Sequence, residues 1–128
     1  LDMVHYIGKK YGEQKNDVFS AADIFVFPTF YPYECFPLVL LEAMQFRLPI
    51  ITTREGGIPD IVSEGETGFF VMKKDIISLV EKLELLIRDK KLREEMGNAG
   101  ENKYANLYTL ELFENRLVQI LISSLHIA

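Results

Sequence analysis

The chain of 128 residues has a single cysteine and fewer basic than acidic side chains. The lone thiol, Cys35, excludes an internal disulfide framework and a cysteine-based zinc site, and it fits a reducing, cytoplasmic compartment. The 14 Lys and Arg residues against 19 Asp and Glu residues give a net charge of −5. Proteins that bind a phosphate backbone ordinarily carry a basic excess, so we expect no nucleic-acid partner.

Long apolar runs and several familiar motifs are also absent. No run approaches the roughly 20 residues that a membrane-spanning helix needs, and nothing at the start resembles a signal peptide. The patterns GxGxxG, GxxxxGK[ST], HExxH and GxSxG do not occur. Neither His5 nor His126 has a cysteine or a second histidine nearby. Both are expected to be structural or surface residues, and we expect no bound metal or cofactor.

The composition is that of a folded domain. Apolar residues make up 48% and charged residues 26% of the chain, as in ordinary globular proteins, and the length suits one domain. The chain begins at Leu1 and enters a strand-like run almost at once. We therefore take residues 1–128 to be a single partial domain, truncated at its N-terminal side, of a longer protein.

Apolar patterns predict strands that alternate with helices. The strands are expected at residues 3–7, 24–27, 49–53 and 69–71, and the helices at 17–22, 37–46, 58–62, 75–87, 92–99 and 110–121. The continuous runs at 24–27 and 49–53 are typical of strands buried on both faces of a parallel sheet. Asp75 and Thr109 are predicted N-caps, and Gly97 and Gly100 are expected to interrupt a helix. The helices are expected to cover the sheet and form the core, which predicts a three-layer α/β domain with a mostly parallel sheet.

Residues 28–44 lead from the carboxyl end of a predicted buried strand into an apolar helix, which is where open α/β sheets bind ligands. Pro37 fits the first helical position. Phe36 before it has no side-chain acceptor, so the amides of Leu38 and Val39 are left for water or a ligand. The helix dipole favours an anion there, which predicts a phosphate site.

Two carboxylates border this segment. Glu42 lies in the otherwise apolar helix, where an unpaired buried carboxylate is costly. It therefore either pairs within the protein or points toward the cleft, and the residues alone do not decide between the two. Glu34 is either a solvated loop charge or an acceptor for sugar hydroxyls, for which a carboxylate is well suited. The aromatic run at 30–33 is either a sugar-stacking platform or simple loop packing.

An ordered series of short motifs resembles the C-terminal, donor-binding domain of the family 4 retaining glycosyltransferases, which have the GT-B fold. The series comprises the Glu34–Glu42 pair, with seven residues between, and ADIFVFPT, EAM, PIIT, GGIPDIV and GxxGF at residues 22–29, 42–44, 49–52, 56–62 and 65–69. The resemblance extends from about Val4 to the final helix. It implies a Rossmann-like domain that forms the C-terminal half of a GT-B fold.

The resemblance also assigns roles. It implies that Glu34 is catalytic and contacts donor-sugar hydroxyls near the reacting carbon, and that Glu42 holds the ribose hydroxyls. The loop that would offer backbone amides to the sugar and diphosphate comprises Cys35, Phe36, Pro37, Leu38 and Val39, of which Pro37 has no N–H and so removes one possible donor. Gly8 and Lys9 would lie near the base, and the turn at 56–57 would shape the pocket floor or serve the structure alone. The family usually has glycines where Cys35 and Pro37 stand, which leaves donor choice and loop geometry open.

The implied reaction transfers a sugar from a nucleotide diphosphate sugar to a hydroxyl of a glycan, a lipid or another acceptor, with retention and without a bound metal. In the family, an Arg and a Lys that bind the diphosphate precede the segment that begins at Leu1, and a further N-terminal domain binds the acceptor. We therefore expect the fragment alone to be inactive, and the whole protein to be cytoplasmic or attached to the cytoplasmic membrane face. The alternatives are a GT-B nucleotide-sugar epimerase or phosphorylase, or a non-catalytic binding or scaffold module with a degenerate site.

Overall fold

The computed structural model describes residues 3–125 and contains a parallel sheet of three strands. The strands are β1 (Phe25–Phe27), β2 (Ile50–Thr52) and β3 (Gly68–Phe70), and they lie side by side in that order. In the register, Ile51 of β2 lies between Val26 and Phe69. All three carboxyl ends therefore meet at one edge of the sheet, and the predicted parallel α/β architecture is confirmed.

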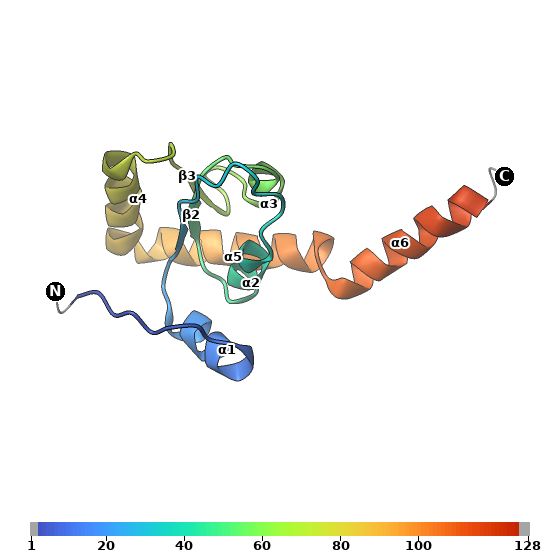
Figure 1. The fold of residues 1–128 in the computed structure, drawn as a ribbon. Coiled ribbons are helices and arrows are strands. Elements are labelled where there is room, and N and C mark those ends of the chain that lie inside the picture. Colours follow the sequence, from blue (N-terminus) through green and yellow to red (C-terminus); the bar gives the residue numbers. More distant parts are fainter. Residues whose placement is uncertain (1–2, 126–128) are drawn as a thin grey trace.

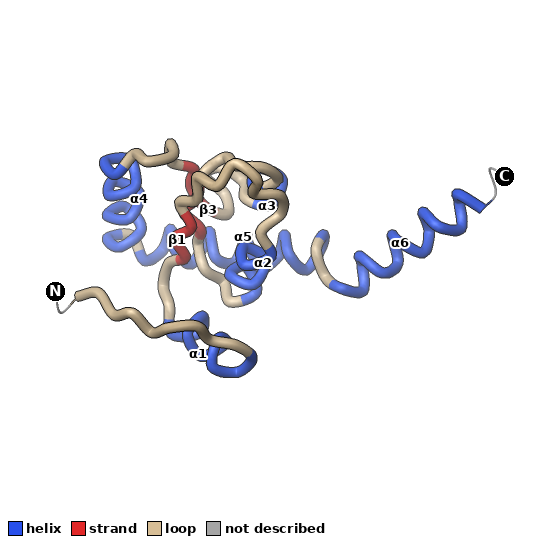
Figure 2. The backbone as a smooth tube through the Cα atoms, in the orientation of Figure 1, coloured by secondary structure: helices blue, strands red, loops and turns tan. Residues whose placement is uncertain are grey.

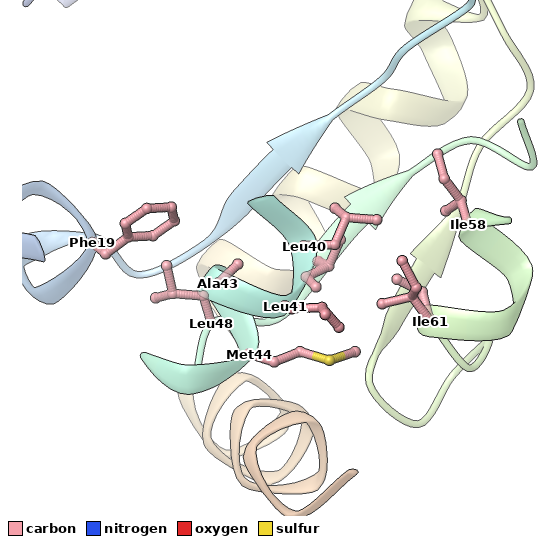
Figure 3. Close-up of a cluster of buried hydrophobic side chains, with 10 residues drawn as sticks. Phe19, Leu40, Leu41, Ala43, Met44, Leu48, Ile58 and Ile61 are labelled. Atoms are coloured by element: carbon pink, nitrogen blue, oxygen red, sulfur yellow. The ribbon is translucent and has the colours of Figure 1, made fainter. Parts of the chain in front are cut away.

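Helices cover both faces of this sheet. The helices of the described chain are α1 (Gly12–Ala21), α2 (Leu38–Gln45), α3 (Ile58–Ile61), α4 (Ile76–Arg88), α5 (Lys90–Leu107) and α6 (Leu110–Leu125), of which α6 does not cover the sheet (Figure 1). Successive residues of a strand point to opposite faces. Ile50 packs into a core built from α2 and α3 side chains, shown in Figure 3, whereas Ile51 packs against Leu86 of α4 and Met96 of α5. The domain thus has the three layers that the sequence predicts.

The central strand β2 and the edge strand β1 differ in burial. All three residues of β2 are buried, as its continuous apolar run predicts. Those of β1 are only half-buried, so the prediction that residues 24–27 are fully enclosed is wrong. β1 is an edge strand whose side chains are only partly covered by the two cores, whereas Phe69 of the other edge strand, β3, is buried in the second core.

Residues 3–7 do not form the predicted strand. They are irregular and exposed, because a strand requires a partner and no strand within residues 3–125 pairs with them. The segment leads instead to α1, which is attached to the first core through Phe19. The Phe19 ring stacks on Phe46 with centroids 5.4 Å apart and lies 5.7 Å from Phe25. His126, expected to be a structural or surface residue, falls outside the described residues.

Helix α5 runs unbroken through both glycines that were expected to interrupt it. A Cβ at Gly97 would lie 2.0 Å from the carbonyl oxygen of Arg47, in the turn after α2. A Cβ at Gly100 would lie 3.4 Å from Cγ of Met44. These glycines therefore permit a close helix crossing, and the prediction of a break is wrong because helix ends and close packing both favour glycine.

The two predicted N-caps are confirmed. Oδ1 of Asp75 accepts a hydrogen bond from the Ser78 N–H at 3.1 Å, and Oγ1 of Thr109 accepts one from the Leu112 N–H at 3.3 Å. Each satisfies one of the N–H groups that the first turn of a helix leaves without a partner.

Helix α6 extends away from the rest of the domain (Figures 1 and 2). None of its residues is buried, so the expectation that it contributes to the core is wrong. Its apolar side chains, such as Leu110 and Ile120, meet no facing element among the described residues. Within residues 3–125, no helix is both long enough and apolar enough to cross a membrane.

Candidate functional site

Two loops meet at the carboxyl edge of the sheet, one after β1 (residues 28–37) and one after β2 (residues 53–57). The buried Thr53 hydroxyl donates a hydrogen bond to the carbonyl of Thr29. The N–H of Gly57 donates to the carbonyl of Cys35 at 2.6 Å. These bonds join the loop that carries Glu34 to the loop that follows the central strand.

The two glycines of the second loop allow an unusually close backbone approach. A Cβ at Gly56 would lie 1.8 Å from the carbonyl oxygen of Glu34, and one at Gly57 would lie 2.7 Å from that of Cys35. Gly56 also has a φ of 51°, in the left-handed region that favours glycine. The turn at 56–57 therefore supports the backbone of Glu34, which is the structural role that the sequence left as one of two alternatives.

Glu34 ends a tight turn and has a free carboxylate. Its N–H donates to the Tyr31 carbonyl at 3.1 Å. Within residues 3–125, its half-buried side chain has no hydrogen-bond or ion-pair partner. Cys35 and Phe36 beside it are both exposed, and the Phe36 ring lies 6.0 Å from that of Tyr108. A carboxylate in this position is available to accept hydrogen bonds from a ligand.

Helix α2 begins one residue later than expected. Pro37 occupies the N-cap and Leu38 is the first helical residue, and no side chain caps the helix. The N–H groups of Leu38 and Val39 belong to the first turn, where an α-helix offers no internal acceptor. Leu38 is exposed and Val39 is half-buried, so this helix start is open to solvent.

Glu42 pairs with a lysine from α1. Nζ of Lys15 lies 2.7 Å from Oε1 of Glu42, and the two side chains are 37% and 33% exposed. Of the two alternatives for Glu42, the structure shows pairing within the protein. A half-exposed pair of this kind contributes at most about 1 kcal/mol, so a ligand can displace Lys15 at little cost.

Gly8 and Lys9 lie elsewhere, in the exposed segment that precedes α1. Gly8 has a φ of 67° and nothing within 4 Å of the position of a Cβ. The chain continues from them into α1, whose Lys15 contacts Glu42.

Sequence reasoning missed the groove of about 560 Å³ that lies at the same edge, between the ends of β2 and β3. In this groove, Nζ of Lys73 lies 3.2 Å from Oε1 of Glu55, and the Arg54 guanidinium lies 4.0 Å from the centroid of the Phe70 ring. The sequence could have indicated this groove, because its charged residues directly follow the carboxyl ends of two parallel strands. In the described part of the chain, no group of three or more potential ligand side chains is arranged to hold a metal ion.

The end of α5 fixes α3, which begins directly after Gly57. The Tyr108 hydroxyl donates to the Asp60 carbonyl at 2.7 Å, and Nζ of Lys103 donates to the same carbonyl at 3.1 Å and to Oγ of Ser63 at 3.0 Å. Burial, followed by the charge of Asp60, raises the pKa of Tyr108. Burial lowers the pKa of Lys103, and the negative charges of Glu66 and Asp60 offset part of this shift.

Comparison with known proteins gives this arrangement a family. Residues 1–103 match the family of glycosyl transferases group 1. The chain belongs to this family. The resemblance carried by the Glu34–Glu42 pair and the motifs around it is thereby confirmed.

The relatives also confirm the fold. The sulfoquinovosyl transferase SQD2 of Arabidopsis thaliana is 38% identical over 98 residues, which cover 74% of this chain and 19% of that protein. Sucrose-phosphate synthase of Thermosynechococcus elongatus superposes with a TM-score of 0.90 at 27% identity, over 99% of this chain and 31% of that one. HepE of Anabaena, solved in complex with UDP, superposes with a TM-score of 0.79 at 20% identity, over 83% of this chain and 29% of that one. The chain thus spans less than a third of each of these relatives, and it matches the C-terminal part of GT-B structures.

Proposed function

We propose that this chain is a single partial domain that binds the donor in a retaining glycosyltransferase. The whole enzyme would move a sugar from a nucleotide diphosphate sugar to a hydroxyl of an acceptor. The observation that carries the proposal is the free Glu34 carboxylate beside the uncapped start of α2, in a member of the glycosyl transferases group 1 family.

The residues of this edge have distinct roles in the proposal. Glu34 accepts hydrogen bonds from hydroxyls of the donor sugar and is the catalytic residue. The open N–H groups at the start of α2, Leu38 and Val39, together with the backbone of residues 35–37, face the sugar and the diphosphate. A helix N-terminus suits such an anion, because its dipole and its free N–H groups both favour negative charge.

Glu42 holds the ribose hydroxyls and exchanges Lys15 for them when the donor binds. Two adjacent hydroxyls can both donate to one carboxylate, which replaces a half-exposed ion pair by two hydrogen bonds. Gly8 and Lys9 are assigned to the side of the base, since the segment that carries them continues into α1 and Lys15. Support for a nucleotide ligand comes from HepE, whose structure was solved in complex with UDP.

Catalysis at this site would rest on positioning and on stabilising the departing diphosphate. In the proposal, the Arg and Lys that the resemblance implies for the diphosphate, and the domain that binds the acceptor, belong to other parts of the whole enzyme. The chain would therefore bind donors weakly and would transfer no sugar by itself.

Titration of the chain with UDP-, GDP- and ADP-sugars, followed by the shifts of its backbone amide NMR signals, tests the proposal. We expect one nucleotide to shift the amides of residues 34–42 more than the rest. Glu34→Gln is expected to weaken binding of the nucleotide sugar but not of the free nucleotide, whereas Glu42→Gln should weaken both.

Two matched variants make this test specific. Lys15→Met removes the ion-pair partner but keeps the Glu42 carboxylate, so binding should persist or improve. Glu114→Gln changes an exposed carboxylate on α6 and should alter nothing. In the whole enzyme, donor hydrolysis that is unaffected by both Glu34→Gln and Glu42→Gln would refute the site. A chain that ignores all nucleotides but binds a protein partner would favour the scaffold alternative.

A further inference from the structure

The rings of Tyr31 and Tyr33, which precede Glu34 in the sequence, are exposed to solvent. Tyr31 is 58% and Tyr33 is 79% exposed, so neither ring is packed into the loop. Of the two alternatives that the sequence leaves for this aromatic run, loop packing therefore does not describe these two rings. Phe30, next to them, is exposed too, but the Lys74 ammonium lies 5.0 Å from the centroid of its ring.

The backbone beneath the rings is well defined. The Tyr31 N–H donates to Oγ1 of Thr29 at 3.2 Å, and the Tyr31 carbonyl accepts from the Glu34 N–H at 3.1 Å. Thr29 is held in turn by the buried Thr53 through its carbonyl. The same turn thus positions both tyrosines and Glu34.

The rings also have a defined arrangement relative to each other. The centroids of Tyr31 and Tyr33 are 5.7 Å apart and their planes meet at 71°. This edge-to-face geometry is favoured by the charge distribution of aromatic rings. It leaves a corner with two apolar walls, each ending in a hydroxyl that can donate or accept a hydrogen bond.

We propose that this corner binds the pyranose ring of a carbohydrate acceptor. The C–H groups on one face of a pyranose are apolar and pack on an aromatic ring, while its hydroxyls at the edge bond to the tyrosine hydroxyls. An uncharged ligand suits the corner, because no ion pair or cation–π contact within the described residues involves Tyr31 or Tyr33. Stacking surfaces with polar tips are also what makes tyrosine frequent at binding sites.

The identification of this sugar as the acceptor rests on the proposed function. If Glu34 holds the donor sugar, a second sugar on the rings of Tyr31 and Tyr33 is bound by the same turn of the chain, and the acceptor is the sugar that this reaction requires next to the donor. The stacking itself requires no donor. It assigns part of acceptor binding to this chain, which the resemblance gives to another domain.

NMR of the tyrosine ring signals tests the proposal directly. The chain is titrated with methyl β-glucopyranoside, methyl α-mannopyranoside and methyl β-galactopyranoside. We expect at least one glycoside to shift the ring signals of Tyr31 and Tyr33. Tyr6 and Tyr11, which are 93% and 74% exposed, are matched controls and should stay unshifted.

Variants separate the rings from their hydroxyls. Tyr31→Phe with Tyr33→Phe keeps both stacking surfaces and should retain the glycoside response, whereas Tyr31→Ala with Tyr33→Ala should lose it. Both substitutions are at exposed positions, so the fold is expected to persist. Equal shifts at Tyr6 and Tyr11, no shift with any of the three glycosides, or an unchanged response in the alanine variant would overturn the proposal.

Kinetics of the whole enzyme provide the second readout. The double alanine variant is expected to raise the KM for a glycan acceptor about tenfold, with the KM for the donor and the rate of donor hydrolysis unchanged. A rise in the donor KM instead would contradict an acceptor role. Glycoside shifts in the chain, together with donor hydrolysis by the whole enzyme that is unaffected by Glu34→Gln and Glu42→Gln, would refute the donor-binding proposal and leave the stacking site in place. Donor hydrolysis that depends on both carboxylates, without any glycoside shift, would refute the stacking site and leave the donor site in place.

Discussion

Replacing Gly56 with alanine tests the close approach of the two loops that carry the candidate site. The added Cβ would lie 1.8 Å from the carbonyl oxygen of Glu34, whereas ordinary contacts begin at 3.4 Å. The loops must therefore separate, or Gly56 must leave its φ of 51°. Either adjustment moves the backbone of Glu34.

The expected loss of stability has two parts. A left-handed conformation costs a residue with a side chain about 1–2 kcal/mol, and forced overpacking adds about 1–3 kcal/mol. Gly65→Ala is the matched control, because Gly65 has a φ of 73° but nothing within 4 Å of the added Cβ. We expect Gly56→Ala to lower the free energy of unfolding by about 2–5 kcal/mol and Gly65→Ala by only about 1–2 kcal/mol.

Denaturant titration of both variants measures this difference. Amide chemical shifts give the local readout, since only Gly56→Ala should shift the signals of Glu34 and Cys35 strongly. Only that variant should also weaken the response of the chain to nucleotide sugars. Equal losses of stability in the two variants, or an unshifted Glu34 amide, would refute the inference that Gly56 supports the site.

Four other substitutions test further contacts of the fold and the site. In α5, Gly97→Ala places a Cβ 2.0 Å from a carbonyl of the turn after α2 and should destabilise the chain by about 1–3 kcal/mol by denaturant titration. Gly100→Ala makes only an ordinary 3.4 Å contact, so its gain in helix propensity of up to about 1 kcal/mol should leave stability equal or higher. Thr53→Val removes the hydrogen bond to Thr29 and leaves that carbonyl unpaired, at a cost of about 1–3 kcal/mol, while Glu34 becomes more mobile in amide relaxation measurements. Burial raises the pKa of Tyr108 above 10.0, so the folded chain keeps a proton that the unfolded chain releases. Stability should therefore fall as the pH rises from 10.0 through that raised pKa, and Tyr108→Phe should remove this part of the fall, because all other groups titrate in both proteins.

The sequence predicts the fold best where local pattern and final environment agree. The run at residues 49–53 is apolar throughout, and β2 at its centre is buried on both faces. Asp75 precedes a clear helical period and caps α4 through its own carboxylate. Both features depend on neighbours within a few residues, which a single sequence displays.

Prediction fails where the outcome depends on a distant partner. Residues 3–7 have a strand composition, but no strand within the described chain pairs with them. The role of Gly97 is decided by a carbonyl at Arg47, which lies on another element. The apolar period of α6 is that of a packed helix, yet the described residues offer it no facing surface. In each case the local sequence pattern is compatible with two different structures, and a distant residue decides between them.

In the candidate site, some features follow from the local sequence pattern and others depend on a distant partner. The Glu34–Glu42 spacing is visible in the sequence, and with the motifs around it identifies the family. The pairing of Glu42 with Lys15 is not visible, because α1 reaches it only in the folded chain. The same holds for the support of Glu34 by Gly56, whose distance from it in sequence says nothing of their contact.

These supports form a continuous path from the end of α5 to Glu34. Tyr108 holds the carbonyl of Asp60 in α3, and α3 begins directly after Gly57. The N–H of Gly57 in turn holds the carbonyl of Cys35, next to Glu34. If this path positions the carboxylate, Tyr108→Phe at neutral pH should shift the Glu34 amide, because it removes the hydroxyl that holds Asp60 but keeps the ring that faces Phe36. The Asp75→Ala variant, which loses a cap of comparable strength on α4, should lower stability without shifting it.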